Sequence, residues 1–233
     1  IQTILERFKI PYTHSGVIAS SLAMDKEISK KIFIKNDIKT PKYITYSYNI
    51  SSLNLIREIK KKLKFPVVVK PLNEGSSVNV YICNETNIIK ILNSIKNYKK
   101  VMIEEFIGGR EIQVAIMGNK KLGAIELKPK RKFYDYKAKY STNAKTQHLI
   151  PVVLSKNKLN KVLNIAMKAH KVIGCSGVTR SDFKFYKGKF HLLEINTQPG
   201  MTKLSLVPEI AAHKGIKFIQ LIEWILNNAS KQK

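Results

Sequence analysis

The stretch that decides the fold around the candidate site is Thr179-Arg180-Ser181-Asp182-Phe183-Lys184-Phe185, followed after a short turn by Leu192-Leu193-Glu194-Ile195-Asn196-Thr197-Gln198-Pro199-Gly200-Met201-Thr202. Both segments are rich in strand-forming residues, and the Tyr-Lys-Gly-Lys sequence at 186–189 between them is typical of a tight hairpin turn. The stretch therefore predicts two antiparallel strands that fold back at Lys187-Gly188.

The two faces of this hairpin differ in chemistry, because side chains alternate across a strand. Arg180 and Asp182 share one face of the first strand, and Glu194 and Asn196 share one face of the second. Folding at the turn brings Asp182 opposite Glu194. The residues of opposite parity are expected on the buried side: Phe183, Phe185, Leu193 and Ile195.

Two carboxylates and an amide beside an arginine form a donor set for a hard cation such as Mg²⁺, with phosphate oxygens as further ligands. The chain has only 16 acidic residues against 42 Lys and Arg, so a cluster of acids is notable. The alternative is an exposed polar strand face followed by a Pro-Gly turn.

The size and composition predict a globular protein of one large or two smaller domains, with 233 residues of which 44% are hydrophobic. The net charge of +26 would suit a nucleic-acid partner. However, the lysines are spread along the chain among many Ile and Asn residues, and no basic stripe interleaved with aromatic residues is present. We expect no nucleic-acid role, whereas the charge would help to attract a nucleotide.

The cysteines and the hydropathy indicate a reduced, cytoplasmic setting. Cys83 and Cys175 are far apart and lack metal-ligand spacing. No apolar run reaches the roughly 18 residues of a membrane span. The sequence begins at Ile1 rather than Met, so a preceding segment stays open.

Periodicity predicts alternating helices and strands in the first half, which favours an α/β or α+β unit. Helices are expected over 1–8, 22–36, 53–63 and 85–97, and strands over 43–46, 65–70, 78–83 and 101–105. In the second half, strands over 111–117 and 122–127 precede a long polar loop over 128–148, a helix over 158–173, the hairpin and a last helix over 216–228.

Two segments of the first half suit a nucleotide. Lys70 ends a buried strand and is followed by Glu74-Gly75-Ser76-Ser77, where small residues let backbone N–H groups approach a phosphate. The backbone at Glu105 to Ile107 could bond an adenine edge, with Phe106 and Ile107 as apolar walls and Glu111 towards the ribose. Alone, each has a plain structural alternative: a solvated lysine, and a glycine-containing connection between strands.

Two segments of the second half complete the candidate site. The long loop carries Lys139, which could reach a phosphate if the loop closes as a lid. Ser205 precedes a predicted helix start, so it either caps that helix or, with the free N–H groups there, binds a carboxylate.

Taken together and in this order, these segments resemble the D-alanine–D-alanine ligases of the ATP-grasp superfamily. The matching pieces are Met24-Asp25-Lys26, Val69-Lys70-Pro71, Glu74 to Ser77, Ile103-Glu104 with Glu111, Phe133 to Tyr140, Arg180-Ser181-Asp182, Glu194 to Thr202 and Ser205 to Pro208. The resemblance implies an α+β fold in which two subdomains grip ATP, with expected divisions at 1–21 (a remnant of an α/β N-terminal domain), 22–103 and 104–233.

The resemblance also implies a function: ligation of two D-alanine molecules through an acyl phosphate, for peptidoglycan synthesis. ATP and two Mg²⁺ ions, which Mn²⁺ could replace, would be required. The implied roles are phosphate contacts by Lys26, Lys70 and Lys139; adenine contacts by Glu104 with the backbone near Phe106 and Ile107; ribose contacts by Glu111; metal binding by Asp182, Glu194 and Asn196; oxyanion stabilisation by Arg180 and the Gly200 N–H; binding of the second substrate's carboxylate by Ser205 and Leu206; and lid closure by Ser76 and Tyr140.

Some properties stay open. The family's N-terminal domain carries a His-Gly and Gly-Glu-Asp-Gly signature that this sequence lacks, and His14 replaces a usual glycine, so the chain is read either as a fragment or as a truncated copy. Alternatives to the dipeptide ligase are another ATP-grasp carboxylate–amine ligase and an inactive remnant that binds ATP or other polyanions. Tyr140 favours the dipeptide product, because relatives that make D-alanyl-D-lactate carry Phe there. The resemblance allows a homodimer for the full-length protein.

Overall fold

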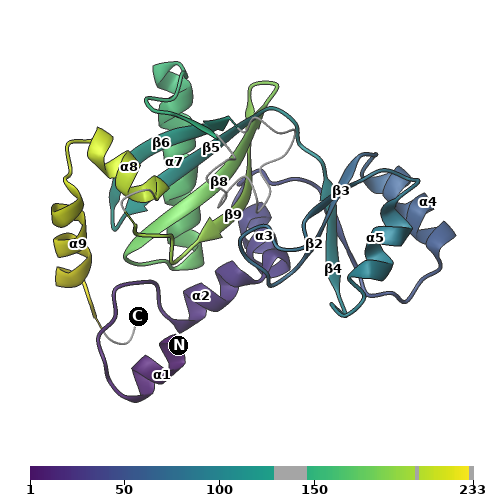
Figure 1. The fold of residues 1–233 in the computed structure, drawn as a ribbon, viewed down its shortest axis with the longest axis horizontal. Helices are drawn as coiled ribbons and strands as arrows, with labels where there is room; N and C mark the ends of the chain where they lie inside the picture. Colours follow the sequence, from purple (N-terminus) through teal and green to yellow (C-terminus); the bar gives the residue numbers. More distant parts are fainter. Residues whose placement is uncertain (129–145, 203–204, 231–233) are drawn as a thin grey trace.

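Two antiparallel sheets, each covered by helices, make up the chain in the computed structural model, which describes residues 1–128, 146–202 and 205–230 (Figure 1). The smaller sheet has four strands in the order β1-β4-β2-β3, and the larger has five in the order β7-β6-β5-β8-β9. Mixed helices and antiparallel sheets confirm the predicted α+β class. None of the described helices is long and apolar enough to span a membrane.

The four-stranded sheet is formed by β1 (Tyr43–Tyr46), β2 (Val67–Pro71), β3 (Tyr81–Cys83) and β4 (Val101–Glu105). Its outer face packs on α4 (Ser52–Lys62) and α5 (Ile88–Ser94), where Val67, Val69 and Ile103 join a buried cluster. Because strand residues alternate, the intervening Val68, Lys70 and Glu104 turn to the opposite face. These three residues line a cavity.

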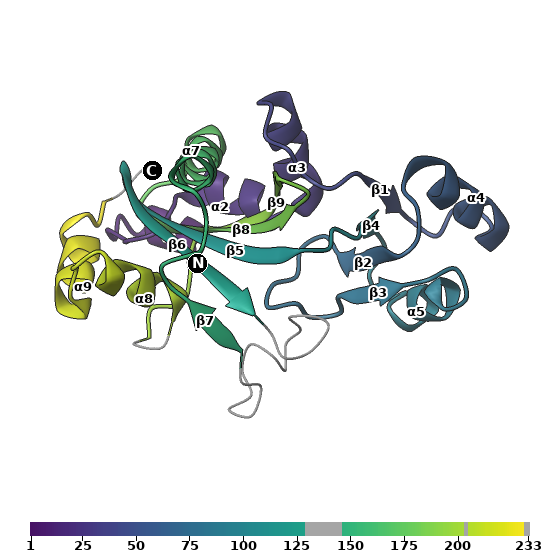
Figure 2. The ribbon, with the colours of Figure 1, turned by 90° about the horizontal axis from the view of Figure 1, so that it is seen from above.

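The five-stranded sheet is formed by β5 (Arg110–Met117), β6 (Lys120–Lys128), β7 (Gln147–Leu149), β8 (Val178–Tyr186) and β9 (Lys189–Asn196). One face is covered by α2 (Val17–Met24), α3 (Lys26–Lys35) and α7 (Lys156–Ile173), and part of the other by α8 (Leu206–His213) and α9 (Phe218–Asn227). Figure 2 shows α3 and α7 on one side of this sheet and α8 on the other.

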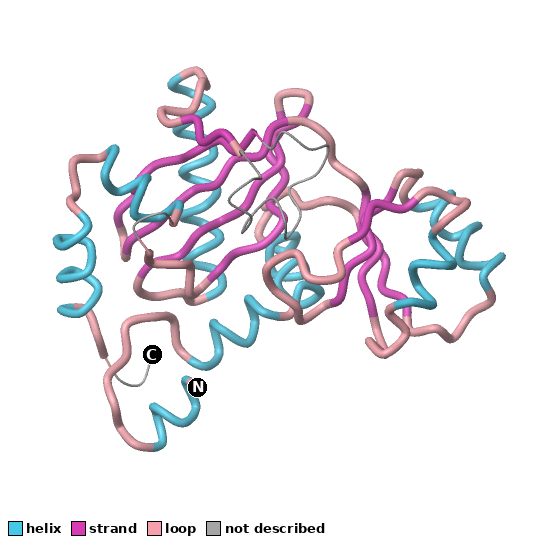
Figure 3. Tube along the Cα trace, viewed as in Figure 1, coloured by secondary structure: helices cyan, strands magenta, loops and turns pink. Residues whose placement is uncertain are grey.

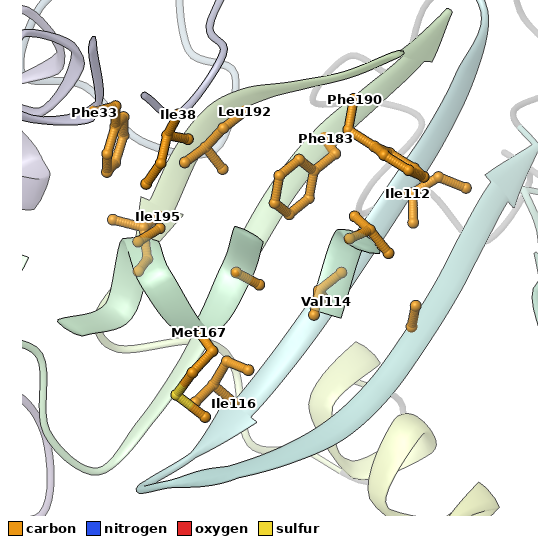
Figure 4. Packing of buried hydrophobic residues seen from close by; sticks show 14 of the residues in the cluster. Phe33, Ile38, Ile112, Val114, Ile116, Met167, Phe183, Phe190, Leu192 and Ile195 are labelled. Carbon is orange, nitrogen blue, oxygen red and sulfur yellow. The ribbon is translucent and has the colours of Figure 1, made fainter. Parts of the chain in front are cut away.

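The core on the α7 side contains the apolar residues of alternate positions on β5, β8 and β9 (Figure 4). Phe183 is wholly buried there and meets Phe190 edge to face, with 6.3 Å between ring centroids. The face of β5 and β8 that α8 and α9 leave open carries Glu111, Gln113 and Asp182. One sheet therefore supplies both a large core and the polar side of a cavity.

The hairpin confirms the central prediction from the sequence. The β8 and β9 strands pair so that Asp182 lies opposite Glu194 and Arg180 opposite Asn196. Lys187 and Gly188 form the two-residue turn with φ of +46° and +74°, the left-handed pair that matches strand twist in tight hairpins. The polar face is thus assembled by local pairing alone.

One position of the hairpin departs from the predicted alternation. The register shifts by one residue between Asp182 and Phe183, so Phe183 lies opposite Leu192. Leu192 consequently joins the core, whereas Leu193, expected on the buried side, lines the cavity beside Glu194. A β-bulge of this kind leaves two residues of one strand facing one of its partner.

The prediction of one continuous helix over 22–36 is wrong, because α2 ends at Met24 and α3 begins at Lys26, with Asp25 between them. Asp25 is extended, and its carboxylate accepts hydrogen bonds from the backbone N–H groups of Glu27 and Ile28. This is an N-cap, which starts a new helix at Lys26. Most other elements lie close to their predicted ranges, although β3 and α5 are shorter and the strand β7 begins inside the segment expected to be a loop.

The packing assigns segments to the two sheets differently from the sequence. The α2 and α3 helices, of which residues 22–35 were expected in the central unit, pack on the five-stranded sheet. The β4 strand crosses the expected division at 103/104. The divisions at 21/22 and 103/104 stay predictions, and the packing favours a division near residues 39–42. Figure 3 shows the first and last segments side by side, where Tyr12 and Ser230 form an antiparallel bridge.

Candidate functional site

Two cavities meet between the sheets. The first is lined on the β2–β4 side by Val68, Lys70 and Glu104 and on the β5–β9 side by Glu111, Lys184 and Leu193. The second extends past Arg180 and Asn196 to Gly200, Ser205 and Leu206. Their linings share Lys26, Glu74, Gly75, Asp182 and Glu194. Two ligands, one in each cavity, would therefore come into contact at the polar junction that these five residues form.

Lys70 and Glu104 lie side by side on neighbouring strands. Lys70 Nζ is 2.5 Å from Glu104 Oε1, and both side chains are almost wholly buried. The second carboxylate oxygen of Glu104 lies 2.8 Å from Lys30 Nζ. Burial opposes ionisation of this carboxyl, but the two ammonium groups outweigh that effect and hold the pKa of Glu104 at about 2. Both carboxylate oxygens are therefore engaged by lysines.

Lys26 belongs to the same junction and begins α3. Its Nζ donates hydrogen bonds to the backbone carbonyls of Leu72 and Glu74 and lies 3.7 Å from Glu194 Oε2. Burial lowers the pKa of Lys26, and Glu194 opposes that effect. A buried ammonium tied to the loop that carries Ser76 and Ser77 fits a role in holding a phosphate.

The far end of the first cavity has an apolar wall and a paired carboxylate. Phe106 and Ile107 line it as expected, together with Glu105 and Glu111. The Glu105 backbone N–H is already bonded to the Lys42 carbonyl, at 2.8 Å. This N–H is therefore occupied, and a flat ring bound here would have to bond other backbone groups between Glu105 and Ile107.

Glu111, the expected ribose ligand, is held from the neighbouring strand. Its Oε2 lies 2.9 Å from Lys184 Nζ, and its Oε1 accepts a hydrogen bond of 3.4 Å from Gln113. Glu111 and Lys184 occupy paired positions on β5 and β8. The carboxylate is thus oriented at the cavity wall by two polar residues.

Asp182 and Arg180 form a two-pronged ion pair on β8. Arg180 Nε lies 2.8 Å from Asp182 Oδ1, and its Nη2 lies 3.1 Å from Oδ2. Gln113, buried on β5, accepts a further bond from Arg180 Nε at 3.2 Å. The arginine is therefore fixed over the junction, with its guanidinium next to a predicted metal ligand.

The predicted metal ligands Asp182, Glu194 and Asn196 all line the second cavity. Asp182 and Glu194 are cross-strand partners, and Asn196 lies one full alternation along β9 on the same face. The Asn196 side-chain oxygen also accepts a hydrogen bond from the Gln198 N–H at 2.9 Å. Two carboxylates and an amide suit Mg²⁺, and the cationic partners of both carboxylates, Arg180 and Lys26, mark the place as one that attracts positive charge.

Gly200 and Ser205 approach each other closely at the end of the second cavity. A Cβ atom at Gly200 would lie 3.0 Å from Ser205 Oγ, which is tighter than ordinary contact. The Ser205 hydroxyl does not cap α8; it accepts a hydrogen bond from the Thr202 N–H and lies 2.9 Å from the Thr202 hydroxyl. The helix start at Leu206 and the position of Ser205 as its N-cap residue are as predicted, although the hydroxyl makes no capping hydrogen bond; the carboxylate role of Ser205 stays a prediction.

The loop after β2 adopts an unusual backbone. Ser76 and Ser77 have φ of +53° and +59°, a conformation that non-glycine residues adopt at a cost of about 1–3 kcal/mol. Gly75 and Ser76 line the second cavity, and Ser77 lines the first. Such strain is typical of ligand-binding loops. Lys139 and Tyr140, the expected lid residues, lie outside the described residues.

Sequence reasoning missed three polar residues of the site: Lys30, Gln113 and Lys184. Gln113 and Lys184 each follow a predicted site residue by two positions, and this shared parity was a usable signal. Lys30 had a weaker one, since it lies one helical turn after Lys26.

Comparison with known proteins shows the family to which this chain is similar. The model of the D-Ala–D-Ala ligase C-terminus matches residues 32–227. The D-alanine–D-alanine ligase of Pelagibacter ubique (strain HTCC1062) is 74% identical over 230 residues, which cover 99% of this chain and 76% of that protein. The chain belongs to the D-alanine–D-alanine ligase family.

Other members of the family are less similar in sequence, and solved structures of the family share the fold. The D-alanine–D-alanine ligase of Wolbachia pipientis wMel is 42% identical over 238 residues, which cover 100% of this chain and 74% of that protein. The crystal structure of the ligase from Bacillus anthracis superposes with a TM-score of 0.85 at 35% identity, over 97% of this chain and 73% of that one. The same enzyme complexed with ATP gives a TM-score of 0.80 at 29% identity. The expected ATP-grasp fold is thereby confirmed.

Proposed function

We propose that this protein joins two D-alanine molecules into D-alanyl-D-alanine with ATP as the energy source, releasing ADP and phosphate. The observation that carries the proposal is the junction of two cavities at Lys26, Asp182 and Glu194. One cavity has the apolar wall and buried cations of a nucleotide site. The other has an arginine and a helix start that suit amino-acid carboxylates.

The nucleotide would occupy the cavity between the sheets. Its adenine would lie against Phe106 and Ile107, its ribose hydroxyls would donate to Glu111, and its phosphates would extend towards Lys26 and Lys70. The carboxylate of Glu104, held by Lys30 and Lys70, would still accept a hydrogen bond from the adenine amino group, because each carboxylate oxygen has more than one lone pair. We extend the phosphate contacts to Lys139 on the basis of the family resemblance.

The first step would be phosphoryl transfer at the junction. A carboxylate oxygen of the first D-alanine attacks the γ-phosphorus, the bond to the β,γ-bridging oxygen breaks, and ADP leaves. The buried ammonium groups of Lys26 and Lys70 stabilise negative charge on the phosphates. The product is an acyl phosphate.

The second step would be acyl transfer. The amine of the second D-alanine, after loss of a proton, attacks the acyl carbon, and phosphate leaves when the tetrahedral intermediate collapses. Arg180 and the Gly200 N–H would stabilise the oxyanion of that intermediate. Ser205 and the Leu206 N–H would bind the carboxylate of the second D-alanine, and Ser76 and Tyr140 would hold the closed lid.

Mg²⁺ fits the donor set of Asp182, Glu194 and Asn196, and Mn²⁺ takes similar oxygen ligands. When bound, it would neutralise charge on the transferring phosphate. Arg180, paired with Asp182, lies beside this donor set, within the same cavity that would hold the oxyanion.

The test is release of ADP from ATP with Mg²⁺, measured with and without D-alanine, with the product identified by mass spectrometry. We expect D-alanine-dependent ADP release and D-alanyl-D-alanine as product. Replacing the second D-alanine by D-lactate, which offers a hydroxyl acceptor, or by other amines decides between this reaction and another ATP-dependent carboxylate ligation. No ADP release, together with no ATP binding, would refute the proposal.

A further inference from the structure

Lys30 is a wholly buried lysine for which neither the fold nor the proposed reaction gives an obvious use. It lies on α3, one turn after Lys26, and its side chain has no exposed surface. Its Nζ donates to Thr40 Oγ1 at 2.6 Å and to the Pro41 carbonyl at 3.2 Å. Lysines are rarely buried to this extent unless they are paired.

The partner of Lys30 is shared with a lysine of the nucleotide cavity. Glu104 has Lys30 Nζ at 2.8 Å from one oxygen and Lys70 Nζ at 2.5 Å from the other. Lys70 and Glu104 line the cavity, whereas Lys30 is absent from its described lining. One carboxylate is therefore held by Lys30 of α3, outside the described lining, and by Lys70 of β2, which lines the cavity.

The charges of this triad do not cancel. One carboxylate faces two ammonium groups, which leaves a surplus positive charge in a buried place. Burial lowers the pKa of Lys30 to about 8, with Glu104 opposing that effect, so Lys30 and Glu104 are both charged at neutral pH. Without Lys30, Glu104 would pair with Lys70 alone, and the surplus charge next to the cavity would disappear.

Stability is a weak explanation for such an arrangement. Buried ion pairs are costly to desolvate, and replacing one by apolar residues is often neutral or stabilising. Binding of a polyanion is a better explanation. There, a buried lysine would hold a second lysine in place and keep the positive charge of that second lysine from being neutralised by Glu104.

We propose that Lys30 is a positioning residue for nucleotide binding: by holding Glu104 from α3, it fixes Lys70 towards the cavity and leaves its charge available to phosphates. This inference rests on the proposed function, since it assumes that the cavity takes ATP. It predicts a much larger loss of affinity for ligands with phosphates than for the nucleoside alone, which meets Glu104 but not Lys70.

The experiment compares Lys30→Met with Lys31→Met in the whole chain. Methionine is similar in length to lysine but uncharged. Lys31, the next residue of the same helix, is exposed and pairs only with the surface residue Glu27 among the described residues. The dissociation constants of Mg²⁺–ATP and of adenosine are measured by calorimetry, and KM for ATP and kcat by ADP release.

For Lys30→Met we expect ATP binding to weaken about tenfold or more, with KM rising in parallel, while adenosine binding and kcat at saturating ATP each change by less than about threefold. Lys31→Met should leave all four within about twofold. In a Lys70→Met background, Lys30→Met should have no further effect on ATP, because the residue through which it acts is gone.

Three results would overturn the inference: unchanged ATP affinity in Lys30→Met, equal weakening of ATP and adenosine, or an undiminished effect in the Lys70→Met background. If Lys30→Met does not fold, Thr40→Val decides, since it removes the acceptor at 2.6 Å and should weaken ATP binding less but equally selectively. Failure of the parent chain itself to bind ATP refutes the proposed function and the inference together, whereas a parent that binds ATP isolates the inference.

Discussion

Replacing Glu104 by glutamine is the perturbation whose size the structure defines best. Glutamine keeps the shape of the side chain but removes its charge, and its amide NH₂ would turn a donor towards an ammonium group. Glu104 is 4% exposed, and each oxygen lies within 2.8 Å of a lysine nitrogen. Two buried ammonium groups would therefore lose their common partner.

The magnitude follows from the pKa of the carboxyl. Burial alone would raise this pKa, but Lys30 and Lys70 lower it from 4.5 to about 2. At about 1.4 kcal/mol per pKa unit, the charged form contributes on the order of 3 kcal/mol to stability at neutral pH. Removing one partner of a buried pair costs a similar roughly 3–5 kcal/mol. For a chain of this length, the melting temperature should fall by about 6–12 °C.

The assay is urea unfolding of the parent and of Glu104→Gln at pH 7, 4.5 and 3. A carboxyl with a lowered folded-state pKa stabilises the protein above its unfolded pKa, and that contribution is lost as the pH falls towards 2. The difference between the two proteins should thus be full at pH 7 and smaller at pH 3. Glu58→Gln serves as the control, since Glu58 pairs with Lys62 at the surface and should change stability by about 0.5 kcal/mol or less.

Either of two results would show that the reasoning is wrong. A difference below about 1 kcal/mol at pH 7 would mean that the lysines find other partners without Glu104. A difference that stays constant from pH 7 to pH 3 would mean that the loss comes from packing rather than from charge.

Three further predictions concern other parts of the site and fold. Lys70→Ala should weaken ATP binding about 10- to 100-fold; unchanged affinity by calorimetry would contradict its phosphate role. Gly200→Ala should lower kcat/KM for D-alanine roughly 10- to 100-fold with ATP affinity unchanged, because the new Cβ would lie 3.0 Å from Ser205 Oγ; normal kinetics would show that this loop simply moves aside. His170 is buried against Thr179, and burial lowers its pKa to about 4, so stability should fall as the pH drops from 6.5 to 4 while the unfolded chain takes up a proton first. His170→Gln should flatten that part of the denaturation profile, and an unaltered slope would exclude His170 as its source.

The sequence by itself determined the parts of the site that depend on local geometry. The alternation of strand side chains places Asp182 opposite Glu194, and the Lys-Gly turn sets the register of the hairpin. Likewise β1 and β4 coincide with their predicted ranges, because short β-branched and aromatic runs bounded by turns have few other conformations. The order of the motifs along the chain was enough to indicate the family.

Contacts between distant segments were decided only by the tertiary structure. Nothing local tells that Lys30 of α3 reaches Glu104 of β4, 74 residues away in the sequence, or that α2 and α3 pack on the five-stranded sheet. The bulge that exchanges Leu192 for Leu193 in the core likewise depends on how β9 fits between β8 and the helices above it. Periodicity predicts on which face of a strand or helix a residue lies. Whether a charged side chain is buried, and whether strand register shifts by one residue, depends on which distant segments pack against it.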